Sequence, residues 1–141
     1  MPTPQSSTAT YFVTTSTSDR HLFEVEVAAQ LFVEVLQHYR REGRYLLHAF
    51  VAMPDHVHLL LTPQGITIER AVQLIKGGFS RRLEANGPVW VKGFHERRMR
   101  DASEYIARRE YIHLNPVRAG LAVRAEDYRW SSAWRGWSRS G

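Results

Sequence analysis

Two apolar runs in the middle of the chain, residues 45–53 and 57–62, are separated by little more than Pro54-Asp55. Both runs have the length and composition of buried strands. Proline cannot donate a ladder hydrogen bond and aspartate favours turns, so the runs are expected to pair as an antiparallel hairpin. The chain must therefore build a sheet, and the second strand of the hairpin is expected to be central in it.

Strand and helix patterns alternate on either side of this hairpin. Residues 11–15 are β-branched and aromatic, whereas three longer segments carry apolar residues at helical spacing. The expected elements are a strand at 11–15, a helix from about 25 to 41 stopped at Gly43, the hairpin, a helix from about 68 to 85 capped by Thr67, a strand or hairpin at 89–96, and a helix from about 103 to 114 capped by Asp101 or Ser103. Pro116 is expected to prevent the last helix from continuing.

This order, β-α-β-β-α-β-α, predicts an α+β fold of the ferredoxin-like split βαβ type. Its sheet would be antiparallel with helices on one face, which leaves the other face for a ligand. At 141 residues the chain is expected to form one domain, at 10–132, between a flexible N-terminal tail at 1–9 and a C-terminal tail at 133–141.

Composition excludes several kinds of chemistry. The chain has no cysteine, which rules out disulfides, thiolate zinc sites and cysteine nucleophiles. The polar N-terminus lacks the features of a secretory signal, and no stretch approaches the length of a membrane span. A cytoplasmic location is therefore expected.

The chain is basic, with a net charge of +5 and a pI near 10.0. This balance favours a polyanionic partner, with nucleic acid first, although a merely solvated basic surface is the alternative. The candidates for phosphate contacts are Lys76, Arg81, Arg82, Arg97, Arg98, Arg100 and Arg108.

His56 and His58 are the first candidates for a chemical site. Side chains alternate along a strand, so both imidazoles should lie on one face while Val57, Leu59 and Leu61 pack on a core from the other. That geometry suits two ligands of one metal ion. Because the chain has seven histidines, the spacing can also arise by chance, and half-exposed histidines without a role are the alternative.

The last predicted helix adds a second group of polar residues. Tyr111 and Asn115 are four residues apart and Arg108 is three residues before Tyr111, so all three share one helix face. Asn115 could supply a third, oxygen ligand to the metal, and Tyr111 could attack a phosphodiester polarised by that metal. Packing alone would also explain Tyr111, and a helix end would explain Asn115. The site requires this helix to lie over the strand that holds the two histidines.

Several separate motifs, in order along the chain, resemble those of one known family. They are Met53-Pro-Asp-His-Val-His58, Trp90 with Gly93-Phe-His-Glu-Arg97, Glu110-Tyr-Ile-His-Leu-Asn-Pro-Val-Arg-Ala-Gly-Leu121, and Tyr128-Arg-Trp-Ser-Ser132. The pattern is similar to that of the tyrosine HUH transposases, and most similar to their REP-associated branch. The resemblance runs from about residue 11 to residue 132.

The resemblance implies a ferredoxin-like fold and an enzyme that acts on single-stranded DNA, often next to a hairpin or palindromic repeat. It implies that His56, His58 and Asn115 bind a divalent metal, usually Mg²⁺ or Mn²⁺, and that Tyr111 is the nucleophile. Attack by its phenolate would leave a 5′-phosphotyrosine and a free 3′-hydroxyl. Attack by another 3′-hydroxyl would then join strands. Relatives occur as monomers and as homodimers, and no feature of the sequence decides between them.

Two other functions stay open at this stage. A module that binds structured nucleic acid without cutting it would need only the basic surface and the sheet. A metallohydrolase would need a general base, for which Asp55 and Glu110 are available but poorly placed. Among the remaining candidates, Tyr105 is off the site face, His113 points away from it, and His95 either flanks the DNA path or is a plain surface residue.

Overall fold

The computed structural model describes residues 9–137. The strands are β1 (Tyr11–Ser16), β2 (Tyr45–Met53), β3 (His56–Pro63) and β4 (His95–Arg98), and the helices are α1 (Glu26–Arg41), α2 (Ile68–Leu83) and α3 (Ala102–Arg118). Two short 3-10 helices, η2 (Leu22–Glu24) and η3 (Ala125–Asp127), lie in connections. The hairpin of β2 and β3 is present with the predicted turn at Pro54-Asp55.

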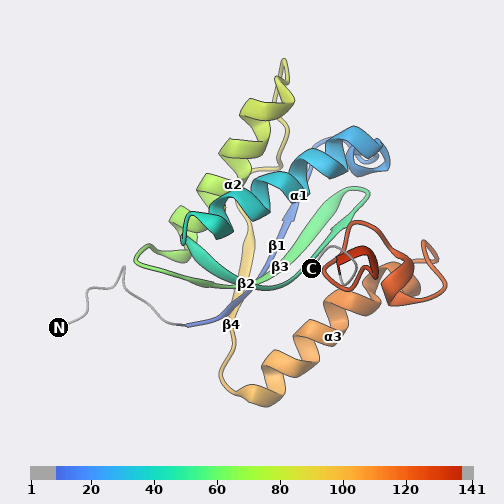
Figure 1. Cartoon of the computed structure of the whole chain (residues 1–141). Helices are drawn as coiled ribbons and strands as arrows, with labels where there is room; N and C mark the ends of the chain where they lie inside the picture. The colour runs from blue at the N-terminus through green and yellow to red at the C-terminus, as the bar shows by residue number, and fades with distance from the viewer. Residues whose placement is uncertain (1–8, 138–141) are drawn as a thin grey trace.

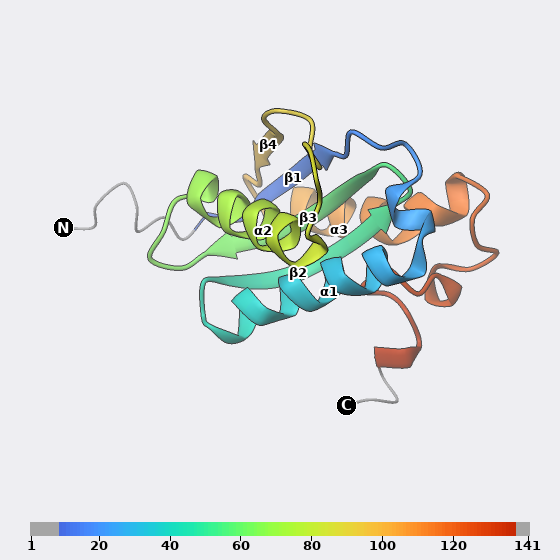
Figure 2. The same cartoon turned by 90° about the horizontal axis from the view of Figure 1, so that it is seen from above.

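The four strands form one antiparallel sheet in the order β2-β3-β1-β4, so β3 is central as predicted. This is the strand order of the ferredoxin-like fold, which confirms the predicted fold class. Helices α1 and α2 lie side by side on one face of the sheet, and α3 lies on the opposite face (Figures 1 and 2). The last helix therefore lies over the face of the sheet that carries the two histidines.

Each face of the sheet has its own apolar cluster. The larger one, under α1 and α2, includes Val57, Leu59 and Leu61, which confirms the predicted inward side of β3. The smaller one, under α3, joins Ala49, Val51, Met53 and Leu60 of the hairpin to Ile112, which is fully buried. A single isoleucine thus supplies the buried apolar contact of α3 in this cluster.

The end of α3 corrects one expectation. The helix continues through Pro116 to Arg118 instead of ending near Leu114. A proline removes one helical hydrogen bond, but Pro116 is buried on the sheet side, and packing there outweighs that loss. Beyond it the amide of Leu121 donates to the carbonyl of Pro116, and Gly120 takes a left-handed φ of 76°, so the helix closes in a Schellman motif.

The segment from Val89 to Phe94 is the other difference. It was expected to be part of a strand, but only Trp90 makes an isolated bridge, with Thr17, and regular pairing begins at His95. The described part of the predicted C-terminal tail, residues 133–137, lies against the domain, where Trp137 packs on the larger core. The remaining tail residues, 1–8 and 138–141, are outside the described part of the chain. Within residues 9–137, no helix is long and apolar enough to cross a membrane.

Candidate active site

The two histidines of β3 face α3, as the strand register requires. His58 lies opposite Thr14 of β1 and His56 lies opposite Ser16. Their imidazole rings are 4.8 Å apart between centroids and nearly perpendicular, at 79°. Two imidazoles this close on one face can direct a nitrogen each toward a common point.

Each imidazole is held by a hydrogen bond at Nδ1. Thr14 Oγ1 lies 2.9 Å from Nδ1 of His58, and Asp55 Oδ1 lies 2.8 Å from Nδ1 of His56. The Asp55 carboxylate accepts from Nδ1 of His56, which leaves the lone pair of that ring on Nε2. The Thr14 hydroxyl can donate or accept, and when it accepts, Nε2 of His58 also carries the lone pair. Oxygen partners of this kind fix the tautomer and the ring orientation of histidines that bind metals. Asp55, expected as a turn residue and as a poorly placed general base, is instead hydrogen-bonded to His56 and orients its ring.

His58 is the more buried of the pair, at 5% exposure. Burial, with smaller contributions from His56 and Arg108, lowers the pKa of its imidazole to about 4. The ring of Phe12 stacks on it with centroids 5.3 Å apart. His58 is thus neutral at physiological pH and able to act as a metal ligand.

The lowered pKa of His58 predicts how stability depends on pH in the metal-free protein. Its folded pKa, about 4, lies below the ordinary value of 6.5, so the folded state favours the neutral ring. This stabilisation is present above about pH 6.5 and is lost as the pH falls toward 4. A shift of this size corresponds to roughly 3 kcal/mol. Urea unfolding from pH 7 to 4 should show the loss in the parent and a smaller one in His58→Gln, and equal slopes would contradict the assignment.

Tyr111 of α3 stands over this pair. Its ring meets His58 edge-on with centroids 5.4 Å apart, and it also touches Phe12 at 5.9 Å. The guanidinium groups of Arg108 and Arg118 lie 5.8 and 5.6 Å from the Tyr111 ring centroid. The phenol is therefore held between a neutral imidazole and two cations.

Asn115 lies one helical turn beyond Tyr111 on the same face of α3, and it is half-buried. The side chain of Asn115 makes no hydrogen bond to another described residue. Within residues 9–137, no group of three or more histidines, cysteines, aspartates or glutamates is placed to hold a metal. The amide oxygen of Asn115 is a type of ligand that suits a hard divalent cation.

A polar hollow of about 380 Å³ opens beside Tyr111, between α3 and β4. Arginines 97, 108 and 118 line it together with Glu104, Glu110 and Tyr111. Arg97 and Arg100 both pair with Glu104, at 3.4 and 2.9 Å, and the hydrogen bonds from Arg100 lower the pKa of that carboxyl to about 2. The hollow has the size and charge to hold phosphate groups of a nucleic-acid strand.

The predicted basic residues divide between the two faces of the sheet. Arg97 and Arg108 lie in the polar hollow, Arg100 lies beside it, and Arg98 lines a neighbouring hollow at the start of α3. Lys76, Arg81 and Arg82 lie on α2, across the sheet from the histidines (Figures 1 and 2). The structure does not bring these three residues into the site.

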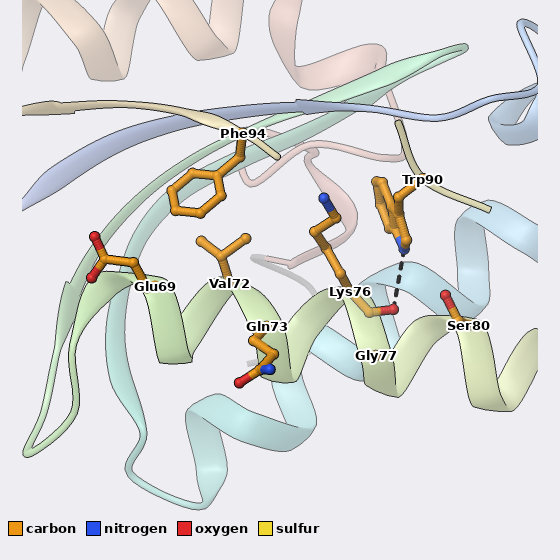
Figure 3. A pocket seen from close by; sticks show the side chains of 8 residues that line it. All are labelled: Glu69, Val72, Gln73, Lys76, Gly77, Ser80, Trp90 and Phe94. Carbon is orange, nitrogen blue, oxygen red and sulfur yellow. Dashed lines mark hydrogen bonds between the residues drawn. The ribbon is translucent and has the colours of Figure 1, made fainter. Parts of the chain in front are cut away.

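Lys76 already has protein partners. Its Nζ donates to the carbonyls of Gly93 at 2.8 Å and Val91 at 3.3 Å, and burial lowers its pKa. Figure 3 shows Lys76 between α2 and the segment that carries Trp90, whose indole donates to the Lys76 carbonyl at 3.1 Å. Lys76 therefore fastens the segment before β4 to α2.

Three further residues were left open by the sequence. His95 lies on β4 opposite Thr14, on the site face and exposed. His113 points away from the site and bonds Ser132. The ring of Tyr105 packs edge-on against His48, 5.2 Å between centroids, away from the histidine pair.

Sequence reasoning missed Phe12, Thr14 and Arg118 as members of the site. The first two lie on β1 and reach His58 only through strand register, which the sequence does not display. Arg118 is three residues after Asn115, so it would share the site face if the helix were continued past Pro116. The proline masked that signal.

The chain is similar to a family of known proteins and to individual relatives. The family model described as transposase, IS200-like, matches residues 5–115. A REP-associated tyrosine transposase of Escherichia coli (strain K12) is 24% identical over 125 residues, which cover 87% of this chain and 75% of the relative. Among solved structures, a REP-associated tyrosine transposase bound to a REP hairpin aligns with a TM-score of 0.82 at 22% identity, over 99% of this chain and 86% of that one.

A second solved structure, a putative transposase from Deinococcus radiodurans R1, aligns with a TM-score of 0.53 at 26% identity. It covers 73% of this chain and 87% of its own. These likenesses agree with the overall fold of the chain. The family model matches well over half of the residues of this chain. The chain therefore belongs to the IS200-like transposases, the tyrosine transposase enzymes that its motifs resemble.

Proposed function

We propose that this transposase is a metal-dependent single-stranded DNA endonuclease and strand transferase in which Tyr111 is the nucleophile. The observation that carries the proposal is the ring contact between Tyr111 and His58, 5.4 Å between centroids, made by residues that lie 53 positions apart in the chain (111 − 58). The contact supports a phenol that acts beside two imidazoles, each with a hydrogen-bonded Nδ1, and Asn115 lies one helical turn beyond Tyr111 on α3. A protein that only bound DNA would have no need for this combination.

His56, His58 and Asn115 would hold a divalent cation, Mg²⁺ or Mn²⁺, through two Nε2 atoms and an amide oxygen. Such an ion polarises a phosphodiester oxygen and offsets the charge that develops in phosphoryl transfer. Thr14 and Asp55 keep the two rings aimed, because each takes up the other ring nitrogen.

In the cleavage step, the Tyr111 oxygen forms a bond to phosphorus and the bond from phosphorus to the 3′-oxygen breaks. The phenol loses its proton, the leaving 3′-oxygen takes one up, and the products are a 5′-phosphotyrosine and a free 3′-hydroxyl. Attack by a different 3′-hydroxyl reverses these bonds and joins new strands. Arg108 and Arg118, on either side of the phenol, would offset negative charge on the phosphate.

The substrate we propose is single-stranded DNA beside a hairpin or palindromic repeat. A relative with the same fold is bound to a REP hairpin in its structure. In this chain the basic residues around the polar hollow supply a path for a phosphate backbone next to Tyr111. Monomer and homodimer are both compatible with this proposal.

Replacing Tyr111 by phenylalanine tests the chemistry. Incubation of the parent with hairpin-flanked single-stranded oligonucleotides and Mn²⁺ should yield a covalent adduct on a denaturing gel, and EDTA should prevent it. Tyr111→Phe should form no adduct, because the attacking oxygen is gone. Tyr105→Phe is the matched control on the same helix and should retain the adduct. Equal adduct from Tyr111→Phe would refute the proposal, and salt-dependent binding without adduct would favour a non-cleaving module.

A further inference from the structure

The segment Tyr128–Ser132, here called the C-terminal clip, lies along the free edge of β2. The amide of Ala52 donates to the carbonyl of Trp130 at 2.8 Å, and the amide of Ser132 donates to the carbonyl of Phe50 at 3.0 Å. Ser131 makes an antiparallel bridge with Val51 and is fully buried. The clip therefore covers the edge strand, which would otherwise expose unpaired backbone groups.

The Ser132 side chain connects this edge to α3. Its Oγ accepts from the amide of Phe50 at 2.9 Å and lies 3.3 Å from the carbonyl of the same residue. On its other side, Nε2 of His113 lies 2.8 Å from the same oxygen. One hydroxyl thus bonds both the edge strand and the helix that carries Tyr111.

Tyr128 makes a second attachment to the sheet. Its hydroxyl donates to the carbonyl of Ala52 at 2.7 Å, and burial raises its pKa to about 12. Its ring packs against the apolar cluster that contains Ile112. The clip is thus anchored on both sides of Trp130.

The direction of the His113 side chain on α3 explains what its hydrogen bond to Ser132 can constrain. Successive helical residues are about 100° apart around the axis, so Tyr111, Ile112 and His113 point in three different directions. Ile112 points to the sheet, Tyr111 points to His58 on one side, and His113 points to Ser132 on the other. Apolar burial is non-directional and leaves rotation about the helix axis loosely fixed, whereas a hydrogen bond constrains direction.

We propose that Ser132 and His113 are positioning residues, which set the rotation of α3 so that Tyr111 and Asn115 face the histidine pair. The inference rests on the proposed function of Tyr111 and extends it to a motif that the chemistry does not itself use. A misplacement of about 1 Å can cost about 10²-fold in rate, so loss of this bond should act on the chemical step and leave DNA binding intact.

The test compares Ser132→Ala, Ser132→Thr and the control Ser103→Ala. Ser103 is an exposed serine of α3. Under single-turnover conditions with Mn²⁺, Ser132→Ala should form the Tyr111 adduct about tenfold more slowly than the parent, at an unchanged half-saturating DNA concentration. Ser132→Thr should recover most of the rate because it restores the hydroxyl, and Ser103→Ala should match the parent. A parent rate in Ser132→Ala, or a change confined to the DNA concentration dependence, would overturn the inference.

Hydrogen exchange gives a measurement that does not depend on activity. In Ser132→Ala, amides of α3 should exchange faster than in the parent, while amides of α1 and α2 keep their protection. Unchanged exchange in α3, or a uniform increase over all three helices, would overturn the positioning role. Failure of the proposed function would look different, since the parent itself would then form no adduct while the exchange result still decides the inference.

Discussion

Replacing His58 by alanine is expected to abolish metal binding at the site and DNA cleavage together. His58 is the buried member of the pair, and its position is over-determined by Thr14, Phe12 and Tyr111. Metal ions supply several kcal/mol of charge stabilisation in phosphoryl transfer, so the adduct rate should fall by at least about 10³-fold. Calorimetric titration with Mn²⁺ and single-turnover adduct formation would measure both effects on the same preparation.

Two further variants make the metal test specific. His48→Ala removes another half-buried strand histidine, which bonds Thr62 at 2.8 Å and lies near Tyr105, so Mn²⁺ affinity should persist. Thr14→Val keeps the ligand but removes its hydrogen-bond partner, and losses of about 10- to 100-fold in affinity are typical of such changes. If His58→Ala bound Mn²⁺ as the parent does, the proposed ligand set would be wrong.

The fold could be predicted because its signals are local. Pro54-Asp55 sets the hairpin, and the alternation of Val57, Leu59 and Leu61 sets which side of β3 meets the larger core. Caps are local as well, since Thr67 accepts from the amide of Arg70 and Asp101 accepts from that of Glu104, as their residue types indicate. The continuation of α3 through Pro116 was missed because burial of that ring is a tertiary effect.

The site was predictable only in part, for the same reason. His56 with His58 and Tyr111 with Asn115 are each recognisable from spacing within one element. Thr14 and Phe12 enter through the pairing of β1 with β3, which no spacing reports. Lys76 shows the converse case, because the sequence presents it only as a basic residue on a helix, whereas the structure gives it carbonyl partners at 91 and 93.

These cases have a common structural cause. One face of the sheet carries the larger apolar core, and the other face carries the candidate site. The face under α1 and α2 holds most of the buried apolar residues, including Leu36, Phe32 and Phe79, and no residue of the candidate site. The face under α3 holds the histidines, Tyr111 and a small apolar cluster centred on Ile112. Stability and chemistry should therefore separate when each core is altered in turn.

Ile112→Ala and Leu36→Ala test this separation, because both side chains are fully buried aliphatic residues of equal carbon number. Each truncation should lower the free energy of unfolding by about 2–5 kcal/mol, as measured by urea denaturation. The adduct rate per folded molecule should stay near the parent value in Leu36→Ala, whose cavity lies across the sheet. It should fall tenfold or more in Ile112→Ala, because Ile112 supplies the buried apolar seat of the helix that presents Tyr111. Equal loss of rate in both variants would show that the catalytic helix depends on global stability and not on its own contacts.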